Sequence, residues 1–422
     1  MKHAQSWRMT GLALAMATAL GSCTTAAPEP EADALPRIDE PGVPKQLQSR
    51  QIIVALAERV QPQWPAIARE LQARYRLRPV GEFPLASIGV QCLVYQVPAG
   101  QTVDAVLTAL RADPRVELAQ PNQGFEALQA APGDAYAALV YGAKLVQVDR
   151  AQRISTGQGV TVAIIDTGAD TDHPDLRGRI SETATFVEGG EPSFRQDRHG
   201  TAIASIIGAR ADGSGLDGIA PEARLSVLKA CWYPEPNAVK ARCSSWTLAK
   251  ALDHAIRQQA RIINLSLGGR ADDLLTRLLK AAEQRNITVV VATLENPHDP
   301  GFPASLSSVI PAIACDARGR VAAPHWPAID FAAAAPGIDV VAPAPPDGYA
   351  LLSGSSLAAA HVSGVIALLL QQTPQATPAQ IKAVLRATAR PVAGANPDTT
   401  PAIGLIDACA ALNRQAPEHA CP

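Results

Sequence analysis

The sequence is poor in aromatic residues and almost balanced in charge. Phe, Trp and Tyr make up 4% of its 422 residues, and the formal net charge is −2. A chain with so few aromatic side chains must build its core mainly from Val, Ile, Leu and Ala. The balanced charge gives no reason to expect a nucleic acid or an acidic polymer as a partner. The chain is long enough for one large core and a small companion domain.

The sequence also lacks a recognisable metal-binding pattern. No group of cysteines and histidines has the spacing of a zinc site, so no metal ligand is predicted. Three acids, Asp170, Asp172 and Asp175, lie close together in the sequence. Their irregular spacing is more typical of a solvated loop than of a ligand set.

No apolar run near the N-terminus is long enough to span a bilayer as a stable helix. Residues 1–23 combine a basic start with a short apolar stretch, which is the pattern of an export signal. The run ends Leu-Gly-Ser-Cys and resembles the lipobox of bacterial lipoproteins, in which the cysteine is acylated. We therefore predict lipidation at Cys23, with plain secretion as the alternative. The protein would leave a bacterial cytoplasm and be periplasmic, an outer-membrane lipoprotein or secreted.

Composition and pattern divide the remaining chain. Residues 24–49 are rich in Ala, Pro, Glu and Asp and predict a disordered tether. Residues 50–127 show a β-α-β-α-β pattern, which predicts a small α+β domain of ferredoxin-like arrangement. Strands and helices alternate throughout residues 138–412, which predicts an α/β domain with a parallel sheet and helices on both faces.

Three short motifs in the larger region carry reactive side chains. The β-branched run 160–165 ends in Asp166, as expected of a buried strand that delivers a carboxylate at its carboxyl end. His199 precedes a helical segment, and Ser356 follows a small-residue turn that opens another helix. Ser attacks, His takes its proton, and Asp orients the imidazolium in a nucleophilic triad. Ser356 alone would be an ordinary helix cap, so the triad hypothesis depends on all three motifs.

These motifs resemble the signatures of the subtilisin-like serine peptidases, in which the order is also Asp, His, Ser. The resemblance covers about residues 159–370 and implies a serine endopeptidase that acts on polypeptides through an acyl-enzyme. It implies that Asn296, after the strand-like run 288–292, donates its amide to the oxyanion. The backbone N–H of Ser356 would be the second donor.

The resemblance also implies substrate-binding residues. Ser266, Leu267 and Gly268 lie in Asn-Leu-Ser-Leu-Gly-Gly, which is similar to the family segment that pairs with extended substrate backbone. Glu295 stands where the family has Gly, and its carboxylate would narrow the specificity pocket or attract basic side chains. It could also displace Asn296, which leaves open a peptide-binding scaffold without activity.

Residues 50–127 resemble the inhibitory propeptide of such enzymes, so the chain would bind its own N-terminal domain. This implies a precursor that cleaves itself within about residues 124–137 and thereby separates the catalytic part from the lipid anchor. No cofactor is implied; some relatives bind calcium, and the sequence assigns no ligand for it. The Asp-Thr-Gly at Asp166 also resembles aspartic peptidases, whose all-β fold does not suit this α/β pattern.

The cysteine content suits an exported protein. Apart from the lipidation candidate, an even number of cysteines remains, which suggests disulfides. The local pairings are Cys231 with Cys243 and Cys409 with Cys421. Cys92 and Cys315 are either a third disulfide, which would tether the propeptide-like domain, or buried thiols.

Overall fold

The computed structural model describes residues 47–127, 141–189, 193–212, 215–235, 238, 240–294, 296, 298–321, 326, 329–392, 402–415 and 421. The predicted signal segment with Cys23, most of the predicted tether, and Glu295 lie outside the described residues. The lipidation of Cys23, the disordered tether and the role of Glu295 stay predictions. At the end of the tether range, Leu47 is buried in a small cluster with Val187 and Trp232.

The first sheet is antiparallel and has the strand order β2-β3-β1-β4. The small domain that contains this sheet consists of β1 (Gln51–Ala57), η1 (Glu58–Gln63), α1 (Trp64–Tyr75), β2 (Arg78–Leu85), β3 (Val90–Gln96), α2 (Val103–Arg111) and β4 (Val116–Pro121). The order β-α-β-β-α-β is the ferredoxin-like arrangement. The sequence pattern missed β2, whose prolines and glycine interrupt it. They are tolerated because β2 lies at the sheet edge.

The main sheet has nine strands among the described residues, in the order β18-β19-β15-β14-β13-β11-β6-β8-β7. Its neighbours pair in parallel except β18 with β19. The strands are β6 (Thr161–Asp166), β7 (Ile180–Thr185), β8 (Arg224–Lys229), β11 (Ile262–Leu265), β13 (Thr288–Ala292), β14 (Ile310–Cys315), β15 (Phe331–Pro336), β18 (Arg390–Pro391) and β19 (Ala402–Leu405).

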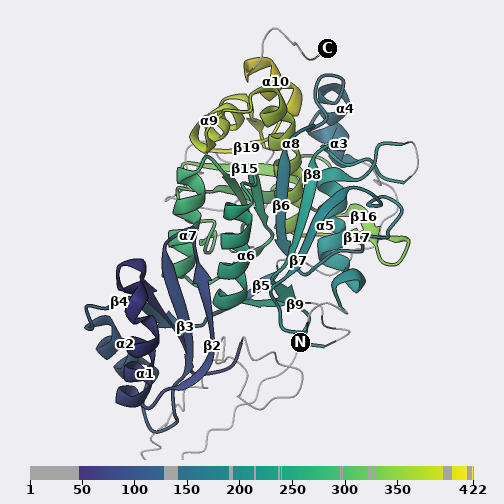
Figure 1. Ribbon diagram of the computed structural model, residues 1–422. Coiled ribbons are helices and arrows are strands. Elements are labelled where there is room, and N and C mark those ends of the chain that lie inside the picture. The colour runs from purple at the N-terminus through teal and green to yellow at the C-terminus, as the bar shows by residue number, and fades with distance from the viewer. Residues whose placement is uncertain are drawn as a thin grey trace, which may run out of the picture. The chain divides into compact units, whose positions relative to one another are not determined.

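Helices cover both faces of this sheet, as Figure 1 shows. The described helices of this region are α3 (Tyr141–Leu145), α4 (Val148–Ala151), η3 (Phe194–Gln196), α5 (Arg198–Gly208), α6 (Ser245–Arg257), α7 (Asp273–Gln284), α8 (Ser355–Gln372), α9 (Pro378–Thr388) and α10 (Ala408–Gln415). Val162 and Ile164 of β6 pack in a cluster with α5 and α8. Ala163 and Ile165 pack in a second cluster with α6 and α7. Alternate residues of a strand face opposite sides of a sheet, so the predicted two-faced α/β fold is confirmed.

The central helix α8 is buried from Ser355 to Leu370. Among the described residues, α8 is the one helix long and apolar enough to cross a membrane, and 89% of it is buried inside the protein. A helix that is apolar on all sides and surrounded by protein is a core helix.

A smaller sheet joins the two regions of the chain, with the order β12-β5-β10-β9. Its strands are β5 (Gly124–Ala127), β9 (Cys231–Trp232), β10 (Arg242–Ser244) and β12 (Leu267–Gly269). β5 follows the small domain and pairs antiparallel with β10 on one side and β12 on the other. Separately, β16 (Val340–Ala344) and β17 (Gly348–Leu352) form a hairpin.

The small domain packs on α6 and α7. Its sheet contributes to the same apolar cluster as both helices, and Phe83 stacks on Trp246 with ring centroids 5.8 Å apart. Gln120 donates to Asp272, the N-cap of α7, and accepts from the N–H of Leu274. The small domain thereby satisfies polar groups at the start of α7.

The structure pairs four cysteines as predicted. The Cα atoms of Cys231 and Cys243 are 4.3 Å apart, and those of Cys409 and Cys421 are 5.5 Å apart. Cys92 and Cys315 are free and buried. They lie in different apolar clusters, so the third disulfide is wrong. Burial raises the pKa of both thiols, that of Cys315 to about 12, which suits packing residues rather than reactive ones.

Candidate active site

Asp166 and His199 form a buried pair. Asp166 ends β6 and His199 lies in the first turn of α5, with His199 Nδ1 2.7 Å from Asp166 Oδ1. The same carboxylate oxygen accepts from the N–H of Thr167 at 2.8 Å and from its hydroxyl at 2.9 Å. A carboxylate held against Nδ1 keeps a proton on that nitrogen, which leaves Nε2 to act as the base.

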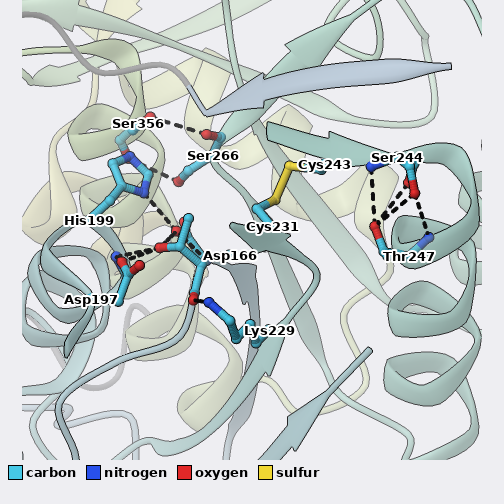
Figure 2. The surroundings of a disulfide bond; sticks show 12 residues. Asp166, Asp197, His199, Lys229, Cys231, Cys243, Ser244, Thr247, Ser266 and Ser356 are labelled. Atoms are coloured by element: carbon cyan, nitrogen blue, oxygen red, sulfur yellow. Dashed lines mark hydrogen bonds and ion pairs between the residues drawn. A yellow bond between two sulfur atoms is a disulfide. The ribbon is translucent and has the colours of Figure 1, made fainter. Parts of the chain in front are cut away.

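The second ring nitrogen of His199 is the unusual atom of the site. Nε2 is buried and has no hydrogen-bond partner within the described part of the chain. Figure 2 shows the ring between Asp166 and Ser356. Buried polar atoms are nearly always paired, so an unpaired imidazole nitrogen needs an explanation, and a proton-accepting role supplies one.

Ser356 lies in the first turn of α8 and is 1% exposed. Its hydroxyl donates to the backbone oxygen of Ser266 at 3.2 Å. Gly354 precedes the helix with φ 148° and ψ 154°, a backbone conformation that is essentially restricted to glycine. The glycine therefore permits the sharp entry that brings a hydroxyl to a helix N-terminus, where backbone N–H groups favour negative charge.

A buried amide fixes Ser266 relative to α8. Asn264 Nδ2 donates to Ser266 Oγ at 2.9 Å, and Ser363 Oγ of α8 donates to Asn264 Oδ1 at 2.9 Å. Ser266 was predicted to bind substrate, and no role was predicted for Asn264 or Ser363. Asn264 interrupts an otherwise apolar strand, and that was the available signal.

Buried charges that the sequence analysis also missed lie next to the Asp166–His199 pair (Figure 2). Asp197 is the N-cap of α5; it accepts from the N–H of Gly200 at 3.1 Å and is in hydrogen-bond contact with the Thr167 hydroxyl. Lys229, at the end of β8, donates to the backbone oxygen of Thr167. Asp197 and Lys229 are 3% and 1% exposed, so neither is a surface charge.

The two neighbouring carboxylates shift the pKa of His199. Burial lowers the pKa of His199, but Asp166 and then Asp197 outweigh it and raise that pKa above its ordinary value. The other motif histidine, His361, bonds through Nδ1 to the backbone oxygen of Leu357 at 2.8 Å, and burial lowers its pKa to about 4. His199 is therefore suited to accept a proton near neutral pH, and His361 is a packing residue.

Asn296 follows β13 and is exposed. Its Oδ1 accepts from the N–H of His298 at 2.9 Å, which leaves Nδ2 as the donor end of the amide. Nearby, the hydroxyl of Thr293 lies 3.3 Å from that of Ser355, which connects this segment to the start of α8. The described contacts do not join Asn296 to Ser356, and its oxyanion role stays a prediction.

The predicted substrate-binding strand is occupied by the chain itself. Leu267 and Gly268 lie in β12 and pair with Ala127 and Glu126 of β5. Phe125, also in β5, lies against Phe302 with ring centroids 6.2 Å apart. It also covers Gly269, where an added Cβ would collide with the Phe125 ring.

Within the described residues, no group of three or more His, Cys, Asp or Glu side chains is arranged to hold a metal ion. The prediction of a solvated loop is wrong for Asp170 and Asp175, which are 7% and 3% exposed, whereas Asp172 is exposed. Asp172 pairs with Arg195 at 2.5 Å, and Asp175 accepts from the Tyr349 hydroxyl at 3.1 Å.

The chain is similar in sequence to known serine proteinases. The profile of the Subtilase family matches residues 157–405. The thermophilic serine proteinase of Bacillus sp. (strain AK1) is 34% identical over 279 residues, which cover 64% of this chain and 67% of that protein. Thermitase of Thermoactinomyces vulgaris is 31% identical over 271 residues, which cover 62% of this chain and 93% of thermitase.

A solved structure is similar in fold. Fervidolysin from Fervidobacterium pennivorans, a keratinolytic enzyme related to subtilisin, superposes with a TM-score of 0.69 at 23% identity. The match covers 86% of this chain, and the chain spans 60% of the fervidolysin chain. This likeness supports the subtilisin-like α/β fold.

Proposed function

Because the chain belongs to the subtilase family, we propose that it is a serine endopeptidase that hydrolyses polypeptides through an acyl-enzyme on Ser356. Ser356 Oγ attacks the carbonyl carbon, and His199 Nε2 takes its proton and later gives it to the leaving amine. Asp166 orients the ring and stabilises the imidazolium. The observation that carries this proposal is a histidine held by a carboxylate at 2.7 Å with its other nitrogen buried and unpaired among the described residues.

Two donors are assigned to the negative charge of the tetrahedral intermediate. The backbone N–H of Ser356 lies at the start of α8, where the helix dipole favours an anion. The amide Nδ2 of Asn296 is the second donor, since Oδ1 of that side chain is already engaged.

The simplest test is peptide hydrolysis by the wild type and two serine variants. Ser356→Ala is expected to abolish hydrolysis, and a loss of about a million-fold is known for a subtilisin without its serine. Ser355→Ala, which changes the neighbouring buried serine, is the matched control and should keep most of the activity. Circular dichroism establishes that both variants are folded. Hydrolysis by a folded Ser356→Ala protein would contradict the proposal.

The chain's own β5 supports a self-processing precursor. Ala127, the last described residue of β5, lies opposite Leu267 in an antiparallel register. Ser266, which precedes Leu267, accepts through its backbone oxygen from Ser356 Oγ. We therefore propose cleavage within the 124–137 region, with the preceding domain acting as an inhibitor.

We also propose a preference for basic side chains, because a carboxylate at Glu295 would attract Lys or Arg and disfavour acidic residues. Cleavage of a peptide library by the wild type and Glu295→Gly proteins tests this idea. The variant is expected to lose preference for basic residues; identical cleavage profiles would remove the idea.

Two other functions have less support. A peptide-binding scaffold has no need of a buried Asp–His pair beside a serine, and the aspartic type has a different fold. Inhibition by a serine-directed phosphonate, and not by an aspartic-peptidase inhibitor, would separate the three.

A further inference from the structure

β10 is one of the two strands that flank β5 in the smaller sheet. β5 pairs with β12 on one side and β10 on the other, antiparallel to both. Just before β10, the backbone oxygen of Ala241 accepts from the N–H of Ala127 at 3.1 Å. An extended substrate that replaces β5 would pair with the same two strands, β10 and β12. This step rests on the peptidase function proposed above.

β12 and β10 are connected to the rest of the protein in different ways. β12 follows β11, a central strand of the main sheet, after the single residue Ser266. On its far side β10 pairs, in the described part of the chain, with β9 through two register pairs, Arg242 with Trp232 and Cys243 with Cys231. So short a ladder is weak by itself.

The disulfide crosses one of those two pairs. Cys231 and Cys243 are directly opposed and bonded, and they are 1% and 0% exposed. Cys231 comes two residues after the end of β8, and the intervening Ala230 N–H donates to the backbone oxygen of Asp166 at 2.8 Å. The disulfide therefore connects β10 to the main sheet beside the Asp166–His199 pair (Figure 2).

The carboxyl end of β10, at Ser244, is fixed by a second contact. Ser244 caps α6 in a reciprocal capping box with Thr247. Ser244 lies opposite Gly124, whereas Ala241 contacts Ala127, nearer to Ser266 and Ser356. The capping box fixes the end distant from Ser356, and the rest of β10 is held by the two-pair ladder with β9 that the disulfide cross-links.

We propose that the Cys231–Cys243 disulfide positions β10 to bind the extended residues of a polypeptide on the amino side of the bond to be cleaved. The triad residues come from β6, α5 and α8, not from β10. Substrates long enough to reach β10 depend on the disulfide, and substrates with a single residue before the bond do not reach that strand.

The first test compares substrates of two lengths on the matured enzyme. The measured quantity is kcat/KM for a peptide with four residues before the bond, the length of β5, divided by kcat/KM for a single-residue ester. In Cys231→Ser/Cys243→Ser protein this ratio is expected to fall about tenfold, chiefly through KM, as for the loss of one or two hydrogen bonds.

Two further variants make that test decisive. Cys231→Val/Cys243→Val keeps the apolar cluster filled and should show the same fall, which covers the case in which the serine variant does not fold. Cys409→Ser/Cys421→Ser removes a disulfide of the same sequence separation, 12 residues, at α10. Its ratio should stay within about twofold of the wild type, because distant sites act independently. An unchanged ratio in the Cys231/Cys243 variants would overturn the proposal.

The second test does not require activity. In the full chain carrying Ser356→Ala, hydrogen exchange of the amides of β5 is measured with and without each disulfide. Exchange is expected to quicken when Cys231 and Cys243 are replaced and to stay unchanged in the Cys409/Cys421 control. Equal protection in all variants overturns the disulfide role, whereas a wild type that hydrolyses neither the ester nor the peptide overturns the peptidase function alone.

Discussion

At the scale of the residue, candidates for the triad could be proposed from the sequence because each lies in a local motif with a distinct chemical role. The partners of the triad could not. Asn264, Asp197 and Lys229 are polar residues whose importance comes from burial beside groups distant in the sequence. A buried lysine at the end of an apolar strand resembles an exposed strand end until the tertiary contacts are known.

Asp197 is expected to influence the pH dependence of hydrolysis. The charged or titratable side chains around His199 are those of Asp166, Asp197 and Lys229, together with Tyr233, whose burial raises its pKa and keeps it neutral. Both carboxylates favour the imidazolium and so raise the pKa of His199. Hydrolysis requires the neutral ring, so a raised pKa moves the acid limb of kcat/KM to higher pH.

Replacing Asp197 by Asn removes one of these charges and keeps a residue that caps helices well. The pKa of His199 falls, and the acid limb of the kcat/KM profile should move to lower pH. Asp172→Asn is the matched control, because that aspartate pairs with Arg195 at the surface. An acid limb in the same place for Asp197→Asn and the wild type would show that Asp197 does not act on the histidine.

At the scale of the element, strands and helices with a strong local pattern were predicted, and those defined by distant pairing were not. β2 is an edge strand broken by prolines, so its pattern is weak. β11 and β12 are separated only by Ser266 and belong to different sheets, which a local pattern does not reveal. β5 lies in the range 50–127 that was predicted as the small domain, although it pairs only with strands of the larger region among the described residues.

At the scale of the whole molecule, the two disulfides lie within the larger region, and neither described pair joins it to the small domain. The two regions share an apolar cluster and hydrogen bonds at α7, so their association after a cut would be non-covalent. If the anchor is at Cys23, cleavage within residues 124–137 would leave the catalytic fragment held at the membrane only by these non-covalent contacts, so its release would not require reduction.

Detergent partitioning tests this release. The wild type is expected to yield a catalytic fragment in the aqueous phase, in equal amounts with and without reductant. The Ser356→Ala protein should remain full-length and in the detergent phase. A wild type that stays one uncut, detergent-bound chain while it hydrolyses added peptides would show that release is not part of maturation.

The central claim is that Ser356 is the nucleophile, and covalent labelling tests it most directly. The protein is treated with a fluorophosphonate, and the modified residue is located by mass spectrometry. The account predicts one adduct, on Ser356, in the wild type and in the Ser355→Ala control, and none in Ser356→Ala. An adduct on a different serine, or no adduct on a protein that hydrolyses peptides, would contradict the account.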